Sequence, residues 1–103
     1  MHIVSRAPFD TAARHYPNQA QALDDLYRVL KKEHYPSPDE MRKRFPSLDR
    51  MKYREKWWVI DVGGGHLRVM FFADFERGKF FIKHISTHAD YDKLTDYYRR
   101  TKE

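Results

Sequence analysis

Residues 57–86 read WWVIDV-GGG-HLRVMFFADF-ERGK-FFIKHIS, which is three apolar runs separated by two short polar or glycine-rich segments. The runs are rich in aromatic and β-branched residues, which favour strands, and the separating segments contain glycine, which favours turns. We therefore predict strands over residues 57–62, 66–75 and 80–86. Connections this short cannot carry a parallel crossover, so the three strands must form an antiparallel meander.

The residues before the meander carry mostly helical patterns. Met1–Ser5 is short and β-branched, and it is predicted as an edge strand. Apolar residues recur at helical spacing from 9 to 16, after Pro8 and before Pro17, which predicts a first helix. Asn18 is expected to cap a second helix, whose apolar stripe is formed by Leu23, Leu26, Tyr27 and Leu30.

Two further helix starts carry the spacing of a capping box. Ser37-Pro38-Asp39-Glu40 predicts a short helix with Met41 and Phe45 facing inward. Thr87 and Asp90 repeat the spacing and predict a last helix, whose inner face is Tyr91, Leu94 and Tyr98. Helices followed by an antiparallel meander indicate an α+β fold, and the length suits one domain over residues 1–103.

Composition and charge narrow the function. The chain has a net charge of +5 and no cysteine, so it can form neither a disulfide nor a thiolate metal site. No secretion signal or membrane-length apolar stretch is present, which predicts a cytoplasmic protein. Residues 42–56 hold only Asp49 and Glu55 against seven basic residues, namely Arg42, Lys43, Arg44, Arg50, Lys52, Arg54 and Lys56. This concentration favours a polyanion such as nucleic acid, with a solvated face or an acidic protein partner as the alternatives.

Several kinds of chemical site are disfavoured by spacing. The triplet Gly63-Gly64-Gly65 lies between two predicted strands and lacks the lysine and hydroxyl residue of a phosphate-binding loop, which indicates a plain turn. His84 and His88 are four residues apart, but that interval crosses from a strand into a helix. With no carboxylate at ligand spacing, we predict no metal site. A serine triad is disfavoured because the chain has no nucleophile elbow.

Arg68 is the strongest candidate for chemistry. Strand alternation places Leu67, Val69 and Phe71 on one face of the sheet and Arg68 with Met70 on the other. Arg68 can pair with Asp61 across the hairpin, or its planar guanidinium can clamp a phosphate.

His88 and Tyr91 lie in the first turn of the last predicted helix, where free N–H groups attract anions. Imidazole exchanges a proton near neutral pH, which suits His88 to acid–base chemistry. Tyr91 shares the spacing of Leu94 and Tyr98 and can equally be part of the core.

Three segments taken in this order resemble the HigB-type toxins of the RelE/ParE superfamily, over nearly the whole chain. They are Phe45-Pro46-Ser47-Leu48-Asp49, Val62-Gly63-Gly64 followed by Leu67-Arg68-Val69, and Thr87-His88-Ala89-Asp90-Tyr91-Asp92-Lys93. The chain departs from the pattern at Gly65-His66, where relatives more often carry Asn-Glu or Asn-Lys.

The resemblance implies a compact RelE-like fold with N-terminal helices, a meander and a C-terminal helix. It also implies an mRNA endoribonuclease that works in the ribosomal A site without a metal or other cofactor and is silenced by a HigA-type antitoxin. The expected catalytic residues are Arg68, His88, Tyr91 and Lys56. Charge predicts a surface for RNA and the ribosome made of Arg42, Lys43, Arg44, Lys52 and Arg54. The resemblance adds Lys83 and His84, in the region where relatives carry another basic residue, and which of the two points into the site stays open at this stage.

The mechanism so implied is attack of a ribose 2′-hydroxyl on the adjacent phosphorus, with Arg68 and a lysine stabilising the charge. Which of His88 and Tyr91 is the base stays open at this stage. Two alternatives are a gyrase-inhibiting toxin of the same superfamily and a non-catalytic RNA-binding module. The second would use exposed aromatic residues for base stacking, for which Trp57, Phe72 and Phe81 are available. Only the nuclease requires Arg68 and His88 to meet on one open face.

Overall fold

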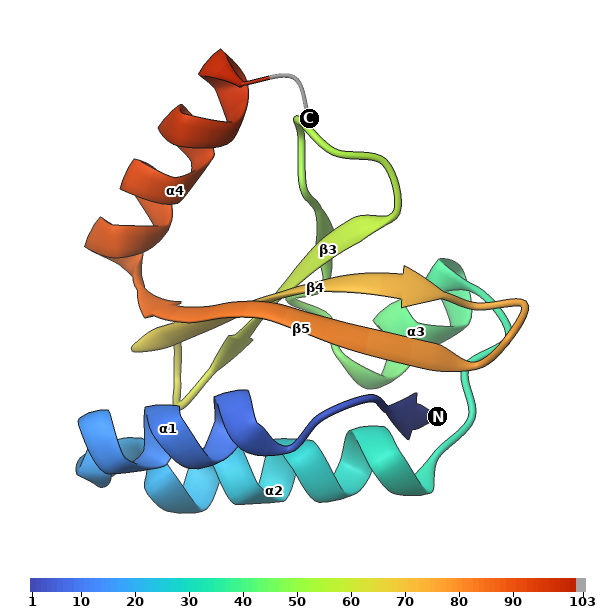
Figure 1. Cartoon of the computed structure of the whole chain (residues 1–103). Helices are drawn as coiled ribbons and strands as arrows, with labels where there is room; N and C mark the ends of the chain where they lie inside the picture. Colours follow the sequence, from blue (N-terminus) through green and yellow to red (C-terminus); the bar gives the residue numbers. More distant parts are fainter. Residues whose placement is uncertain (102–103) are drawn as a thin grey trace.

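Three helices lie on the two faces of one sheet. In this computed structural model, which describes residues 1–101, α1 (Ala7–His15) and α2 (Ala20–Lys32) lie side by side under the sheet, and α4 (His88–Arg100) stands over the opposite face (Figure 1). The short α3 (Pro38–Arg44) lies beside the sheet. In the sequence it comes between α2 and the meander. This arrangement confirms the α+β prediction.

The sheet has the strand order β1-β5-β4-β3-β2. Its centre is the predicted antiparallel meander, with each strand end within one residue of the prediction. The predicted edge strand is confirmed, and it pairs parallel with β5. The short strand Asp49–Arg50, which pairs with the first strand of the meander, was not predicted, because two residues carry no periodic signal. The strands are β1 (His2–Ile3), β2 (Asp49–Arg50), β3 (Trp57–Val62), β4 (Leu67–Asp74) and β5 (Lys79–Thr87).

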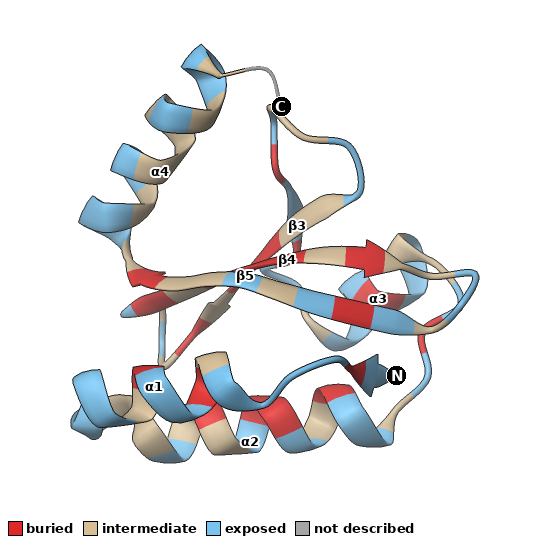
Figure 2. Cartoon of the chain, in the orientation of Figure 1, coloured by how far each residue is buried: buried red, intermediate tan, exposed pale blue. Residues whose placement is uncertain are grey.

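The main core lies between the sheet and the α1–α2 pair, where buried residues concentrate (Figure 2). The alternation of β4 is as predicted, with Leu67, Val69 and Phe71 buried in this core. Met70 is buried on the other face, opposite Val59. The face under α4 is therefore partly apolar, and Arg68 lies on it.

The predicted caps are confirmed at two helices and wrong at one. Ser37 Oγ accepts a hydrogen bond from the Glu40 amide at 3.2 Å, and Thr87 Oγ1 accepts one from the Asp90 amide at 3.3 Å. Asn18 does not cap α2, because Pro17–Gln19 form a 3₁₀ turn and the cap position falls on Gln19 without a side-chain bond. The fixed φ of a proline at the first position favours a helical turn, whereas a capping residue needs an extended backbone.

Gly63-Gly64-Gly65 forms the predicted turn between β3 and β4. All three residues have positive φ, at 65°, 67° and 89°, which glycine adopts without steric cost. A Cβ on Gly63 would meet the Gln19 side-chain oxygen at 1.9 Å, so this tip also approaches the helical side of the molecule. No helix within residues 1–101 is long and apolar enough to cross a membrane.

Candidate active site

Arg68 joins β3, β4 and α4 through one side chain. Its Nε lies 3.2 Å from Asp61 Oδ1 and 3.4 Å from His88 Nε2, and its guanidinium carbon lies 4.7 Å from the centre of the Tyr91 ring. The Arg68 side chain is 28% exposed and Asp61 is 35% exposed, so the cluster opens to solvent. The predicted pair with Asp61 is thus present, and the guanidinium also faces the two candidate acid–base groups, so the phosphate clamp stays a prediction.

Local structure explains why these residues meet. Asp61 and Arg68 are direct cross-strand partners in the β3–β4 hairpin. Arg68 is also opposite Ser86 in β5, and α4 begins two residues later at His88. Because β5 runs directly into α4, the first helical turn lies beside Arg68, and His88 and Tyr91 both contact the guanidinium.

The contact between Arg68 and His88 sets the state of the imidazole. An arginine Nε–H can only donate, so Nε2 of His88 accepts and the proton of the neutral ring lies on Nδ1. His88 is exposed, as expected for a residue in the first turn of a helix that stands over the sheet. The geometry therefore gives His88 an unprotonated nitrogen, Nε2, which faces Arg68 in this structure.

Tyr91 is half-buried under the Arg68 guanidinium. Burial raises the pKa of its phenol, and the nearby Arg68 charge opposes the rise without cancelling it. The phenol therefore keeps its proton at neutral pH and can act as a hydrogen-bond or proton donor. The sequence left open whether Tyr91 is a packing residue or an acid–base candidate. Its ring is half-buried and also faces the Arg68 guanidinium, so its position is compatible with both roles.

A second cluster holds the other end of α4. Tyr98 Oη lies 2.8 Å from His84 Nε2, and its ring is 4.8 Å from the Arg54 guanidinium carbon. Arg54 also donates to the backbone oxygens of Tyr98 and Thr101, at 3.1 and 3.2 Å. A guanidinium placed at carbonyl groups of a helix C-terminus is electrostatically favourable. Arg54 thus ties residues 51–56 to α4, and its predicted contact with RNA stays a prediction.

Lys83 and His84 both lie on the α4 side of the sheet, which strand alternation alone would not allow. The register shifts between Met70 and Phe71, so Lys83 is an extra residue in β5. Such a bulge re-aims side chains. His84 turns to Tyr98, and Lys83 Nζ lies 5.4 Å from the centre of the Trp57 ring.

The structure does not bring Lys56 to Arg68. Lys56 precedes β3, whereas Arg68 pairs with Asp61 near the other end of that strand, which separates them by about 16 Å along the sheet. Lys56 has a φ of 63°, and its carbonyl accepts a hydrogen bond from the Ala73 amide at 2.9 Å. Its side chain lines a separate pocket with Arg50 and Trp58. A catalytic role for Lys56 thus has no geometric support from this cluster and stays a prediction.

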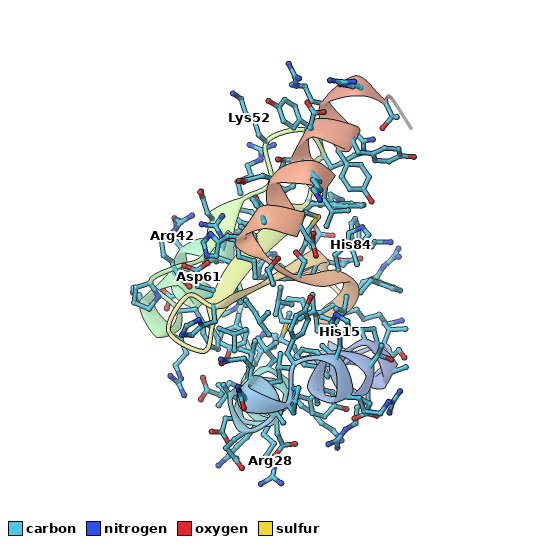
Figure 3. The ribbon with its side chains drawn as sticks, turned by 90° about the vertical axis from the view of Figure 1, so that its left-hand side faces the viewer. His15, Arg28, Arg42, Lys52, Asp61 and His84 are labelled. Atoms are coloured by element: carbon cyan, nitrogen blue, oxygen red, sulfur yellow. The ribbon has the colours of Figure 1, made fainter. Side chains whose placement is uncertain are left out.

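The basic residues of α3 are balanced by carboxylates from outside the basic window. Each of the three is exposed and paired at 3.1–3.4 Å: Arg42 with Asp39, Lys43 with Glu40, and Arg44 with Glu33. Sequence counting missed this because the acidic partners precede residue 42. Arg42 and Lys52 are seen on the Asp61 side of α4 in Figure 3, with Lys52 level with the far half of the helix.

Ser86 was not singled out by the sequence. It is buried, and its Oγ is the one buried side-chain polar atom without a hydrogen-bond partner within residues 1–101. Its position opposite Arg68 puts this hydroxyl under the first turn of α4. A small polar residue in a strand gives no signal of this kind, so only the structure reveals it. Across residues 1–101, no group of three or more His, Cys, Asp or Glu side chains is arranged to hold a metal ion.

A family model described as HigB_toxin, the RelE-like toxic component of a toxin-antitoxin system, matches residues 19–94. This chain belongs to the HigB toxin family. The resemblance inferred from its three motifs is therefore confirmed.

Relatives in the HigB family cover the chain from end to end. It is 57% identical over 103 residues to the mRNA interferase HigB of Escherichia coli O6:H1 strain CFT073, with all of both chains covered. It is 35% identical over 99 residues to the mRNA interferase toxin HigB of Escherichia coli K12, covering 96% of this chain and 95% of that one. The mRNA interferase HigB of Shigella flexneri matches to the same extent.

We predict that Ser86→Ala leaves the free energy of unfolding unchanged within about 1 kcal/mol or raises it, because it removes a buried hydroxyl that has no partner. Urea unfolding followed by circular dichroism measures this. A loss well above that value would mean that the hydroxyl has a bonding partner and supports the cluster.

A second prediction concerns His84. Burial, with a smaller contribution from the charge of Lys83, lowers its pKa below the ordinary 6.5. Between the two pKa values the unfolded chain therefore binds a proton at this histidine more readily than the folded chain does. The neutral His84 costs the folded state nothing above about pH 6.5, and the free energy of unfolding decreases as the pH falls through the lowered pKa. We expect the wild type to lose more unfolding free energy between pH 7.5 and 5 than His84→Gln loses.

The matched control for that experiment is His34→Gln, which removes an exposed histidine. Its unfolding free energy should follow the wild-type pH dependence. Parallel pH curves for the wild type and His84→Gln would contradict the assignment.

Proposed function

We propose that this HigB-family protein is a toxin that cleaves mRNA by phosphoryl transfer at the Arg68 cluster. The observation that carries the proposal is the meeting of Arg68, His88 and Tyr91 on one solvent-accessible face. A guanidinium, an unprotonated imidazole nitrogen and a protonated phenol are together the groups that internal transesterification of RNA requires. The printed names of the relatives, which describe mRNA interferases, support the same conclusion.

In the proposed reaction, the ribose 2′-oxygen attacks the adjacent phosphorus and the bond from phosphorus to the 5′-oxygen breaks. His88 Nε2 takes the 2′-hydroxyl proton, and the Tyr91 phenol gives a proton to the departing 5′-oxygen. The products are a 2′,3′-cyclic phosphate and a free 5′-hydroxyl. Proton exchange with solvent then returns imidazole and phenol to their starting states, so no external reactant is consumed.

Arg68 supplies the electrostatic part of the reaction. A phosphate oxygen would compete with Asp61 and with His88 Nε2 for the guanidinium. Breaking the contact with His88 frees its acceptor nitrogen for the 2′-hydroxyl, so substrate binding and activation of the base are one event. Before the phosphate arrives, Asp61 orients the guanidinium through their ion pair.

The proposed partners follow from charge and family. A net charge of +5, with exposed lysines at positions 52, 56 and 83, suits association with RNA on the ribosome. The family description, a toxic component of a toxin-antitoxin system, supports an antitoxin partner, for which we propose a HigA-type protein. Since mRNA under translation is the proposed substrate, the place of action would be the cytoplasm.

We predict that Arg68→Ala lowers the rate of mRNA cleavage on ribosomes at least about 100-fold, the usual cost of removing one transition-state donor. Arg68→Lys should retain an intermediate rate, because lysine keeps the charge but loses the planar donor geometry. The measurement is single-turnover cleavage, with product ends tested for the 2′,3′-cyclic phosphate. Circular dichroism and thermal melting confirm that each variant is folded.

Arg77→Ala is the matched control, since Arg77 is an exposed arginine in the β4–β5 turn. It should cleave at the wild-type rate. A folded Arg68→Ala variant that cleaves as fast as the Arg77→Ala control would reject the proposed function.

A further inference from the structure

Three aromatic side chains form a row across the sheet face that carries Arg68. Trp57 in β3 is the cross-strand partner of Phe72 in β4, and Phe72 is the partner of Phe81 in β5. Direct partners point to the same side of a sheet, and Phe72 has the parity of Arg68 and Met70 in β4. The ring centres of Phe72 and Phe81 are 5.7 Å apart. We call Trp57, Phe72 and Phe81 the aromatic row.

The aromatic row reaches the solvent. Phe81 is 36% exposed, and Trp57 and Phe72 are partly exposed. At the other end of the row, the Trp57 ring packs on Tyr98 of α4, with centres 5.1 Å apart. Tyr97, which is 57% exposed, packs on Tyr98 in turn. A pocket lined by Arg54, Trp57, Tyr97, Tyr98 and Thr101 lies at this end.

Positive charge accompanies the row. Lys83 Nζ lies 5.4 Å from the Trp57 ring centre, a position that depends on the bulge in β5. Lys56 immediately precedes Trp57 and is exposed. The carboxylate on the same face beyond Phe72 is Asp74, which pairs with Arg77 at 3.8 Å. Aromatic rings flanked by cations are the combination that binds single-stranded nucleic acid, since bases stack on rings while cations neutralise phosphates.

The aromatic row and the Arg68 cluster lie along the same strand, at a distance that a short oligonucleotide can span. Phe72 is four residues from Arg68 along β4, which is about 13 Å in a strand. That distance corresponds to about four steps of 3.4 Å between stacked nucleotides. Met70 lies between Arg68 and Phe72 on this face and is buried. A short single strand of this length would therefore pass Met70 at its side, with a phosphate at Arg68 and bases on the row.

We propose that the aromatic row is a base-stacking subsite that binds single-stranded RNA beside the scissile phosphate. The inference rests on the proposed function for the identity of the strand, but it concerns binding and not cleavage. Stacking on rings tolerates all four bases, so the subsite contributes affinity and positioning with little preference for sequence.

The test uses a hexanucleotide with 2′-O-methyl riboses, which cannot be cleaved by 2′-hydroxyl attack. The chain has two tryptophans, so Trp58→Phe leaves Trp57 as the single fluorescent reporter. Trp58 belongs to the opposite face, where it packs against the main core. We expect the oligonucleotide to quench Trp57 fluorescence, and an abasic oligonucleotide of equal length, which keeps the phosphates, to cause no quenching.

Fluorescence anisotropy of a labelled oligonucleotide measures binding independently, in proteins that keep Trp58. Phe81→Leu and Trp57→Leu should each weaken binding at least about fivefold, the lower end for loss of one base–aromatic stack. Phe75→Leu is the matched control, because Phe75 packs its ring on Trp58 and Phe80. It should bind as the wild type does.

Two outcomes would overturn the subsite. One is equal binding by Phe81→Leu, Trp57→Leu and the control, and the other is equal quenching by abasic and base-bearing oligonucleotides. If the row variants bind RNA normally but fail to bind the antitoxin, the row is a protein interface instead. Failure of the proposed function is a separate result, because a wild type that binds the oligonucleotide but leaves ribosomal mRNA intact keeps the subsite and loses the nuclease.

Discussion

The contact of Arg68 with the first turn of α4 is the interaction on which the candidate site depends. No residue of α4 is buried, so the helix is not held over the sheet by a core of its own. It is held by Arg68 at its start, through His88 and Tyr91, and by Arg54 and His84 at its end. The catalytic candidates are therefore brought together only when α4 is docked, and residues far from the phosphate contribute by docking it.

Arg68 and Asp61 form a partly exposed ion pair, whose free energy can be compared with that of an arginine–phosphate bond. Pairs of this kind contribute about 0–1 kcal/mol. A charge-assisted, two-pronged bond from arginine to phosphate is stronger. Asp61 can therefore orient Arg68 in the absence of RNA and still yield it when a phosphate arrives. In the proposed mechanism, the structural ion pair and the phosphate clamp would be successive states of the Arg68 side chain.

Local sequence signals predicted the meander, the caps at Ser37 and Thr87 and the turn at Gly63-Gly64-Gly65, because each depends on residues close together in the chain. Alternation in β4 likewise predicted that Arg68 lies apart from the main core. The parallel pairing of β1 with β5 was beyond such signals, since it joins segments more than seventy residues apart.

Site assembly was only partly predictable for the same reason. The thirteen-residue α4 follows β5 without a linker, so the placement of His88 near Arg68 follows from chain continuity and register. The bulge at Lys83 has no sequence signature, yet it puts Lys83 and His84 on one face. Lys56 directly precedes β3, the neighbour of the strand that carries Arg68, but the register separates the two residues along the sheet. Counting charges along the sequence could not show that Glu33 forms an ion pair with Arg44.

The central claim is that Arg68 and His88 act as one unit on an RNA phosphate. A double-mutant cycle measures this most directly, using single-turnover cleavage of ribosome-bound mRNA by the wild type, Arg68→Lys, His88→Gln and the double variant. If binding of phosphate to Arg68 is what frees His88, His88→Gln should slow the wild type strongly and the Arg68→Lys variant by less than about threefold. Multiplication of the two single effects in the double variant would contradict the account.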